Sequence, residues 1–587
     1  MSIYRELIRH SAVYSVGQIL YRVASLLLLP LYTKYLTPAD YGVMTILDLT
    51  RDILGYFAAA GVINAATRYY HDPAYADSRH DCWTTGLVFL MVICIPQMVL
   101  AYLLRSPLAL ITIRDGSPEG SLLVALTILN LLVSVFFNYC ASYLRVEKRS
   151  VLFVCLTIPD LIARVSLNIL FIAHLRMGIL GFLYSGLIVG GVQSVVLITL
   201  LFAGRRFRIR RELFRPFFAY GWPFVISGLA SLAMHQANRY FLLWFGNDKA
   251  QVGLFSVAFN MAQAANQFLI QPFFSIWFTM AFEINTLPDR LQVFHRVFKY
   301  FVLGIGLVLL LVALLSTALV RALTQPNYYE IANVLPILCL AFLFFPLHVF
   351  FSLPALLYNK TQAVAANCLV AAGATLVLNF ILVPTLGMYG AAIASIGTYV
   401  VYSFAGYRAY RRIENLRFPV RFVGFIAGAG VVTYLIYRLV VPSSAPFWVL
   451  VVVPLAAWSL IVALVMAGPA RALIDSDSHL RKWLSRRKAA RGSSKPAPRT
   501  GNQEKLSRAG AAPAEEPAPP AGSGREPPAR ETPIAAPAAS VLEQAGVERR
   551  HDVPHAILPH DEGKVVPRCA VGDQLNVERE LGSHPKN

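Results

Sequence analysis

Fourteen apolar segments, each long enough to cross a lipid bilayer, constrain the fold of this chain more than any other feature. A transmembrane helix needs about 20 largely apolar residues to cross a hydrocarbon core about 30 Å thick. The chain of 587 residues is 56% hydrophobic and only 14% charged, which excludes an ordinary soluble protein. The sequence therefore predicts an all-α polytopic membrane protein with about 14 transmembrane helices. The segments lie at 10–32, 41–66, 82–104, 120–143, 151–173, 178–203, 217–244, 251–281, 297–320, 331–357, 362–383, 388–410, 420–440 and 446–467.

The distribution of basic residues predicts the orientation of these helices. A net charge of +20 would suggest a nucleic-acid partner in a soluble chain, but here Lys and Arg lie mostly in short connections and in the tail. If the N-terminus is cytoplasmic, the inner connections carry 22 Lys and Arg residues and the outer connections carry 7. By the positive-inside rule, both termini are predicted to be cytoplasmic and no nucleic-acid partner is expected.

An internal repeat divides the first twelve segments into two halves. Gly178 and Gly181 match Gly387 and Gly390 at an offset of 209 residues, and Asn168 matches Asn379 at 211. Two weaker matches agree with these: Lys148 with Lys360 at an offset of 212, and AspTyrGlyVal at 40–43 with GlnValGlyLeu at 251–254 at an offset of 211. Six helices per half keep both halves in the same orientation, which predicts a substrate cavity between them near the membrane midplane.

The predicted domain organisation follows from the repeat and from composition. After residue 464, basic and apolar residues alternate as in a helix lying on the membrane surface, and from about residue 492 the chain is rich in Pro, Ala, Gly and Ser. We expect an N-terminal six-helix bundle at 1–204, a basic cytoplasmic linker at 205–215, a C-terminal six-helix bundle at 216–412, two additional transmembrane helices at 413–467, a basic interfacial segment at 468–491 and a disordered tail at 492–587.

Two predicted helices in the first half carry charged side chains on one face. In segment 10–32, Gln18 and Arg22 share a face with three serines, and in segment 41–66, Asp48, Arg51 and Asp52 form a second stripe. Ionisable groups at membrane depth cost roughly 2.5–3.5 kcal/mol each on insertion scales, and they usually mark a substrate or ion path. Two interpretations of the second stripe stay open. Arg51 either is neutralised by its own aspartates or binds an anionic substrate, with one aspartate left as a proton or cation site.

The second half presents a more neutral set of polar residues. His235, Asn238 and Arg239 lie together in segment 217–244, and four amides follow one face of segment 251–281. Such amides also hold transmembrane helices together, so binding and helix packing both remain interpretations. The predicted substrate-binding residues are Arg22, Arg51, Arg239, Gln18, Asn238, Asn260, Gln263, Gln267 and Gln271, and the coupling-ion candidates are Asp48, Asp52 and His235. For Asp160 and Arg164, a structural ion pair is the expected role.

The sequence lacks the motifs of the common enzyme sites. No phosphate-binding loop, zinc-binding His pair or nucleophile elbow is present, and the seven cysteines are scattered without paired spacing. The outer connections are short, which disfavours a membrane glycan polymerase or transferase. We therefore expect a transporter with no enzyme activity, no metal and no cofactor, and with H⁺ or Na⁺ coupling at one of the coupling-ion candidates.

Four stretches resemble a known family. They are LeuLeuProLeuTyrThrLysTyrLeuThrProAlaAspTyrGly at 28–42, AlaAlaGlyValIleAsnAlaAlaThrArgTyrTyr at 59–70, TyrGlyTrpProPhe at 220–224 and LeuGlyMetTyrGlyAlaAlaIleAla at 386–394. Over about residues 5–440 the chain resembles the polysaccharide or O-antigen (Wzx-type) flippases of the multidrug/oligosaccharidyl-lipid/polysaccharide exporter superfamily. The long tail departs from the pattern of that family.

The resemblance implies a function and a location. Members of the family move an oligosaccharide on an undecaprenyl pyrophosphate carrier across the bacterial cytoplasmic (inner) membrane by alternating access, for lipopolysaccharide or exopolysaccharide synthesis. Implied partners are the lipid-linked substrate, membrane lipids, and the glycan polymerase and glycosyltransferases of the same pathway. Arg22, Arg51 and Arg239 fit a cationic cavity because guanidinium grips phosphate oxygens in a bidentate way. The alternatives are a multidrug or metabolite antiporter on the same fold, a lipid II flippase and, less favoured, a membrane glycan polymerase.

Overall fold

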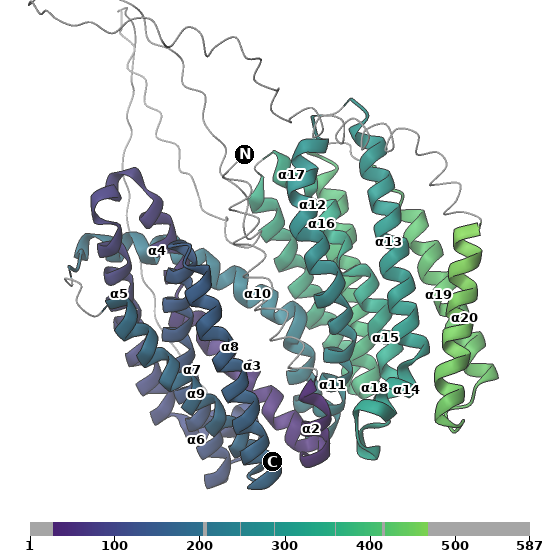
Figure 1. Cartoon of the computed structure of the whole chain (residues 1–587), viewed down its shortest axis with the longest axis horizontal. Helices are drawn as coiled ribbons and strands as arrows, with labels where there is room; N and C mark the ends of the chain where they lie inside the picture. Colours follow the sequence, from purple (N-terminus) through teal and green to yellow (C-terminus); the bar gives the residue numbers. More distant parts are fainter. Residues whose placement is uncertain are drawn as a thin grey trace, which may run out of the picture. The chain divides into compact units, whose positions relative to one another are not determined.

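The computed structural model describes residues 27–202, 208–246, 248–286, 288–358, 360–413 and 417–467, and every regular element within these ranges is helical (Figure 1). The predicted all-α fold class is confirmed. The predicted site residues Gln18 and Arg22 lie outside the described residues, as do the predicted interfacial segment and tail at 468–587.

The helices of the first half run from α2 to α9. Their bounds are α2 Leu29–Tyr35, α3 Pro38–Ala59, α4 Val62–His71, α5 Arg79–Leu103, α6 Arg105–Thr112, α7 Pro118–Val146, α8 Ser150–Asn168 and α9 Gly178–Phe202, with a π-helical segment at Ile169–His174.

The second half runs from α10 to α18, and two more helices follow it. The bounds are α10 Phe214–Gly246, α11 Lys249–Ala265, α12 Gln271–Ile284, α13 Arg290–Leu314, α14 Ser316–Leu323, α15 Ile331–Phe344, α16 Leu347–Phe351, α17 Leu353–Leu357, α18 Thr361–Tyr410, α19 Val420–Val440 and α20 Phe447–Ala467. A π-helical segment at Asn266–Ile270 separates α11 from α12.

Ten helical stretches in the described chain are long and apolar enough to cross a membrane. Helix α3 is not among them, since it carries the charges of Asp48, Arg51 and Asp52. The predicted segment 41–66 is divided between α3 and α4, because Ala60 and Gly61 both have left-handed backbone conformations with φ of 43° and 67°. The predicted segments 362–383 and 388–410 both fall within α18, on the two sides of a break in helical geometry at Gly387.

Helices α3 and α11 cross in direct backbone contact at Gly42 and Gly253. A Cβ atom on Gly42 would lie 2.0 Å from the carbonyl oxygen of Lys249, and one on Gly253 would lie 1.9 Å from that of Pro38. In both cases the clashing carbonyl oxygen belongs to the residue four positions before the glycine of the other helix. This reciprocity is the signature of a pseudo-two-fold axis between the two helices, and it relates residues that the predicted repeat had already aligned.

The repeat also appears in the backbone conformation of two other glycines. Gly178 at the start of α9 has a φ of 57°, and Gly387 inside α18 has a φ of 54°. Residues other than glycine rarely adopt this region because of their Cβ atom. At Gly387 the chain leaves helical geometry, so α18 consists of two helices joined at this residue. Both glycines thus make the turn between the last two helices of their half.

Helix α10 contacts both halves of the molecule. Its first turns pack on the first half: the ring of Phe217 lies 5.5 Å from that of Tyr69, and the Arg68 guanidinium lies 4.6 Å from the centre of the Tyr220 ring. Gly221 meets the α3–α4 junction so closely that a Cβ atom on it would lie 2.1 Å from the carbonyl oxygen of Ala60. The rest of α10 packs mainly on α18 and α11.

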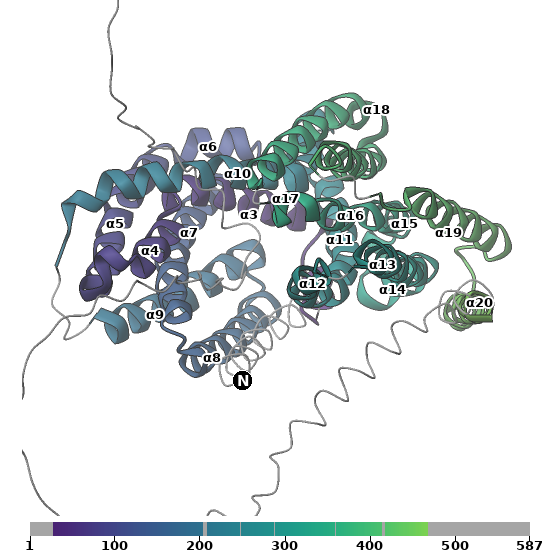
Figure 2. The same cartoon turned by 90° about the horizontal axis from the view of Figure 1, so that it is seen from above.

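The two additional helices are attached to the second half, beside α13 and α14 (Figure 2). Leu314, Tyr437 and Leu450 belong to a small apolar cluster of their own there. The indole nitrogen of Trp458 donates to the carbonyl oxygen of Leu307 at 2.8 Å, and Arg321 donates to the carbonyl oxygens of Ser443 and Ala445 in the connection between α19 and α20. Most of the surface of α19 and α20 stays apolar and uncovered, as lipid-facing helices require.

Candidate functional site

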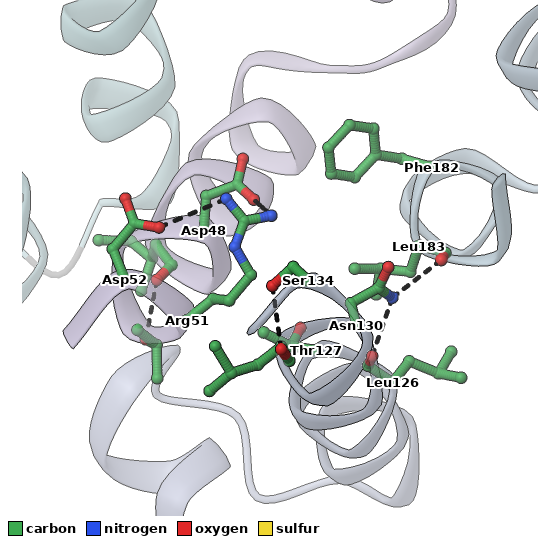
Figure 3. Close-up of polar contacts among 12 residues, drawn as sticks. Asp48, Arg51, Asp52, Leu126, Thr127, Asn130, Ser134, Phe182 and Leu183 are labelled. Atoms are coloured by element: carbon green, nitrogen blue, oxygen red, sulfur yellow. Dashed lines mark hydrogen bonds and ion pairs between the residues drawn. The ribbon is translucent and has the colours of Figure 1, made fainter. Parts of the chain in front are cut away.

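The charged stripe of the first half lies on α3. Thr37 and Asp40 form a capping box at its start, with Pro38 in the first turn, so this helix begins at a fixed point. The Arg51 guanidinium lies 3.0 Å from an Asp48 carboxylate oxygen and 3.4 Å from one of Asp52. Figure 3 shows Arg51 between the two aspartates, on the side of α3 that faces α7 and α9. All three side chains remain 34–42% exposed, so the stripe is paired but still accessible.

A second arginine, Arg164 on α8, lies near the first. It forms an ion pair with Asp160 at 3.1 Å, in which the aspartate is buried and the arginine is 32% exposed. Arg164 lies within electrostatic range of Arg51. The sequence interpretation, which treated Asp160 and Arg164 as a structural pair, found the contact but missed this proximity to the α3 stripe. The sequence contained one indication of this proximity, because charged residues interrupt the apolar segments 41–66 and 151–173 alike.

Gly186 makes room for the Asn130 side chain beside this second arginine. A Cβ atom on Gly186 of α9 would lie 2.6 Å from the Asn130 side-chain oxygen and 3.6 Å from a terminal nitrogen of Arg164. Asn130 itself donates to the carbonyl oxygens of Leu126 and Leu183, which ties α7 to α9 (Figure 3). The polar surface therefore extends from α3 over α7, α8 and α9.

The described charges of this surface do not sum to a cationic site. Asp48, Asp52 and Asp160 contribute three negative charges, and Arg51 and Arg164 contribute two positive charges, which leaves a formal charge of −1. A bound anion therefore requires a further cation or the protonation of one carboxylate. Arg22, predicted to share this side of the molecule, would supply a cation, but it lies outside the described residues.

Arg239 on α10 is placed differently from Arg51. It is only 3% exposed, its Nε donates to Ser256 Oγ at 3.0 Å, another nitrogen donates to Gln236, and its guanidinium lies 4.9 Å from the centre of the Phe259 ring. No carboxylate lies within ion-pair distance of Arg239 in the described part of the chain. Asp52 lies within its electrostatic range. The positive charge of Arg239 therefore acts on the α3 stripe, but its N–H groups are buried and do not face a ligand.

Asn238 and His235 connect α10 to α18. Asn238 donates to Ser395 Oγ at 2.8 Å and to the carbonyl oxygen of Ala391 at 3.1 Å, and it accepts from Asn379 at 3.0 Å. His235 Nδ1 lies 2.9 Å from the Tyr399 hydroxyl oxygen. These contacts are the ones expected from the helix-packing interpretation. Asn379 also matches Asn168 of the first half, which donates to Tyr32 and accepts from Ser185.

The four amides of the predicted stripe in 251–281 are distributed over three elements. Asn260 on α11 donates to the Tyr41 hydroxyl at 3.3 Å and so joins α11 to α3. Gln263 is half-buried at the end of α11, Gln267 lies in the π-helical segment, and Gln271 is exposed at the start of α12. Because a π segment interrupts the regular spacing of an α-helix, the four side chains do not follow one continuous helix.

Comparisons with known proteins agree with the fold and the resemblance. The family model described as "Polysaccharide biosynthesis protein" matches residues 7–284, from before the first described helix to the end of α12. A search of curated protein sequences returned no match.

Two groups of solved structures share the fold. The chain is similar to the lipid II flippase MurJ in an inward closed conformation, with a TM-score of 0.61 and 13% identity over 80% of this chain and 100% of that one. It is also similar to an inward-facing multidrug resistance MATE family transporter of the MOP superfamily, with a TM-score of 0.53 and 16% identity over 69% of this chain and 98% of that one. At these sequence identities the similarity shows a shared fold. Over residues 7–284 the chain matches the polysaccharide biosynthesis protein family, and its described part has the fold of MurJ and the MATE transporters.

Proposed function

We propose that this protein is a flippase that moves a lipid-linked oligosaccharide, carried on undecaprenyl pyrophosphate, across the bacterial cytoplasmic membrane for surface polysaccharide synthesis. The observation that carries the proposal is the pair Arg51 and Arg164. Both guanidinium groups are partly exposed, Arg51 on α3 and Arg164 on α8, and both lie within residues 7–284, which match the polysaccharide biosynthesis family. Guanidinium binds phosphate oxygens in a bidentate way, and two of them suit a pyrophosphate.

In this proposal the residues have distinct roles. Arg51 and Arg164 bind the pyrophosphate, and Arg22 and Gln18 complete the site from the preceding segment. Asp52, which is more exposed and farther from Arg51 than Asp48 is, takes the coupling H⁺ or Na⁺. Neutralising this carboxylate removes the excess negative charge of the surface, so cation binding and anion binding favour each other. Gln263, Gln267 and Gln271 contact the sugar.

A second candidate is a multidrug or metabolite antiporter. The observation that favours it is the same charge count: three carboxylates against two arginines suit a cationic compound better than an anion. The similarity to a MATE transporter is compatible with this candidate at the level of the fold.

Transport by the full chain in proteoliposomes distinguishes the two candidates. We would measure the transfer of a fluorescent undecaprenyl-pyrophosphate oligosaccharide between leaflets by quenching from outside, and in parallel the uptake of a cationic dye against a proton gradient. The matched variants are Arg51→Gln and Arg105→Gln. Arg105 is the first residue of α6, and its guanidinium lies 4.7 Å from the centre of the Tyr102 ring.

The flippase proposal expects lipid transfer in the wild type and in Arg105→Gln, with a loss of at least about tenfold in Arg51→Gln, because one charge-assisted hydrogen bond contributes about 1.5–3 kcal/mol. Dye uptake without lipid transfer would replace the proposal with the antiporter. Equal lipid transfer in both variants would remove Arg51 from the site.

A further inference from the structure

A basic pocket lies at the end of α18, far along the chain from the candidate site. It has a volume of about 590 Å³ and is lined by Phe404, Tyr407, Arg408, Arg411 and Arg412. This volume is within the range of about 300–1,000 Å³ that is typical of small-molecule sites. Three arginines can bind an anionic group, and two aromatic rings can contact an apolar group attached to it.

The floor of the pocket is held by fixed aromatic contacts. The Tyr407 ring lies 4.8 Å from that of Phe351 on α16, and its hydroxyl accepts from the backbone nitrogen of Phe418 at 3.2 Å. The Phe404 ring lies 6.2 Å from that of Phe351. The Arg411 guanidinium lies 5.6 Å from the centre of the Tyr407 ring. The pocket is therefore a formed surface, supported from below by α16.

The rim of the pocket is cationic and accessible. Arg408 near the end of α18 and Arg412 in the turn after it are both exposed, and both line the pocket. In the part of the chain that the structure describes, neither of them forms an ion pair. The sequence from 404 to 421 contains five arginines and one acidic residue, Glu414. The local charge thus stays strongly positive.

The position of the pocket at the end of a membrane-spanning stretch favours a lipid as its ligand. The apolar stretch Gln362–Tyr410 is long enough to cross the membrane, and the arginines lie at or just after its end. That end is predicted to be cytoplasmic by the positive-inside rule. Arginine with tyrosine at the end of a span lies at the depth of lipid head groups, and basic pockets on this side bind anionic lipid head groups.

We propose that this pocket binds the phosphate head group of an anionic phospholipid of the inner leaflet. Arg408 and Arg412 hold the phosphate oxygens, and Phe404 and Tyr407 contact the glycerol and the first acyl carbons. A lipid with two phosphates uses more of the arginines than a lipid with one, so it binds more tightly. The site is separate from the α3 stripe and does not depend on the proposed transport function.

Native mass spectrometry of the full chain in mild detergent tests the proposal. The probes are diphosphatidylglycerol, phosphatidylglycerol, phosphatidylcholine and inorganic pyrophosphate. The test variant is Arg408→Gln/Arg412→Gln, and the control Arg105→Gln/Arg438→Gln removes the same charge from α6 and α19. Arg438 donates to Asn333 at 2.9 Å, so it lies at a different site.

We expect diphosphatidylglycerol to bind the wild type and the control with equal affinity, and the test variant at least about tenfold more weakly, since hydrogen bonds to charged groups contribute about 1.5–3 kcal/mol each. Arg408→Lys/Arg412→Lys should give an intermediate affinity, because lysine keeps the charge and loses the bidentate geometry. Equal binding to the test variant, or equal binding of phosphatidylcholine, would overturn the proposal. Pyrophosphate that binds as tightly as the lipid would overturn the choice of a lipid.

A measurement on the wild type alone covers the case in which the double variant does not fold. Increasing salt should release diphosphatidylglycerol progressively, because exposed charges are screened within about 10 Å at 0.1 M ionic strength. Binding that does not change with salt would show that the arginines do not hold the head group.

Discussion

Gly42 of α3 and Gly253 of α11 meet so closely that a Cβ atom on Gly253 would lie 2.9 Å from the backbone nitrogen of Gly42. The two residues are 211 positions apart, which is the offset of the internal repeat. They therefore lie next to the pseudo-two-fold axis. No side chain separates the halves at this point, so the contact depends on the absence of two Cβ atoms.

We predict that Gly253→Ala destabilises the protein by about 1–3 kcal/mol, the range for overpacking a tight contact, because the new methyl group meets the Pro38 carbonyl. Thermal unfolding in detergent measures the change. Gly428→Ala on α19 is the control, since a Cβ atom there meets nothing within 4 Å. Equal melting temperatures for the two variants would mean that the helices can separate at no cost.

Arg51→Gln should abolish export of surface glycan in cells and leave the amount of membrane-inserted protein unchanged, because the side chain is partly exposed and contributes little to packing. Glycan staining and immunoblotting of the same cells give both quantities. Normal export would favour the interpretation in which Arg51 only neutralises Asp48 and Asp52.

Substitutions of Asp160 and Arg164 should separate stability from transport. Arg164→Gln removes the ion pair of the buried Asp160 carboxylate with Arg164 and should cost about 3 kcal/mol, the lower end for buried pairs, since Arg164 is 32% exposed. Asp160→Asn/Arg164→Gln should recover most of that stability and still fail to transport. Recovery of transport in the double variant would assign the pair a structural role only.

Arg239 should behave in the opposite way to Arg51. Because it is buried against Ser256, Gln236 and Phe259, Arg239→Gln should lower the melting temperature and the protein level together with transport. A stable Arg239→Gln variant that is inactive would instead make Arg239 a binding residue. Thermal unfolding and transport are measured on the same preparation.

Deletion of residues 492–587 should leave transport intact, because this stretch is rich in Pro, Ala, Gly and Ser and cannot form an apolar core. Export by cells that express the shortened chain at a normal level is the test. Loss of export under these conditions would assign the tail a function.

Sequence patterns predicted the all-helical fold, but they did not predict which polar side chains the packing of the helices brings together. Apolar length identifies spans because the bilayer sets one requirement for all of them, and the repeat was visible because Gly178 and Gly387 need a left-handed backbone. The roles of Arg239 and Asn238 could not be predicted, since a polar residue on a helix face can point into a cavity or toward a neighbouring helix. The approach of Arg164 to Arg51 depends on how α8 packs, which spacing along one helix does not encode.

The placement of α10 has a mechanical consequence for any transport cycle. Its first turns are fixed to α4 and α5 of the first half by Phe217, Tyr220 and Gly221, while Asn238 and His235 fix its other end to α18. One continuous helix therefore contacts both halves. The two halves can tilt apart only if α10 bends. Pro223 lies just after Gly221 and has no backbone N–H to donate, so the helical hydrogen bonding is weakest there and α10 should bend at this residue.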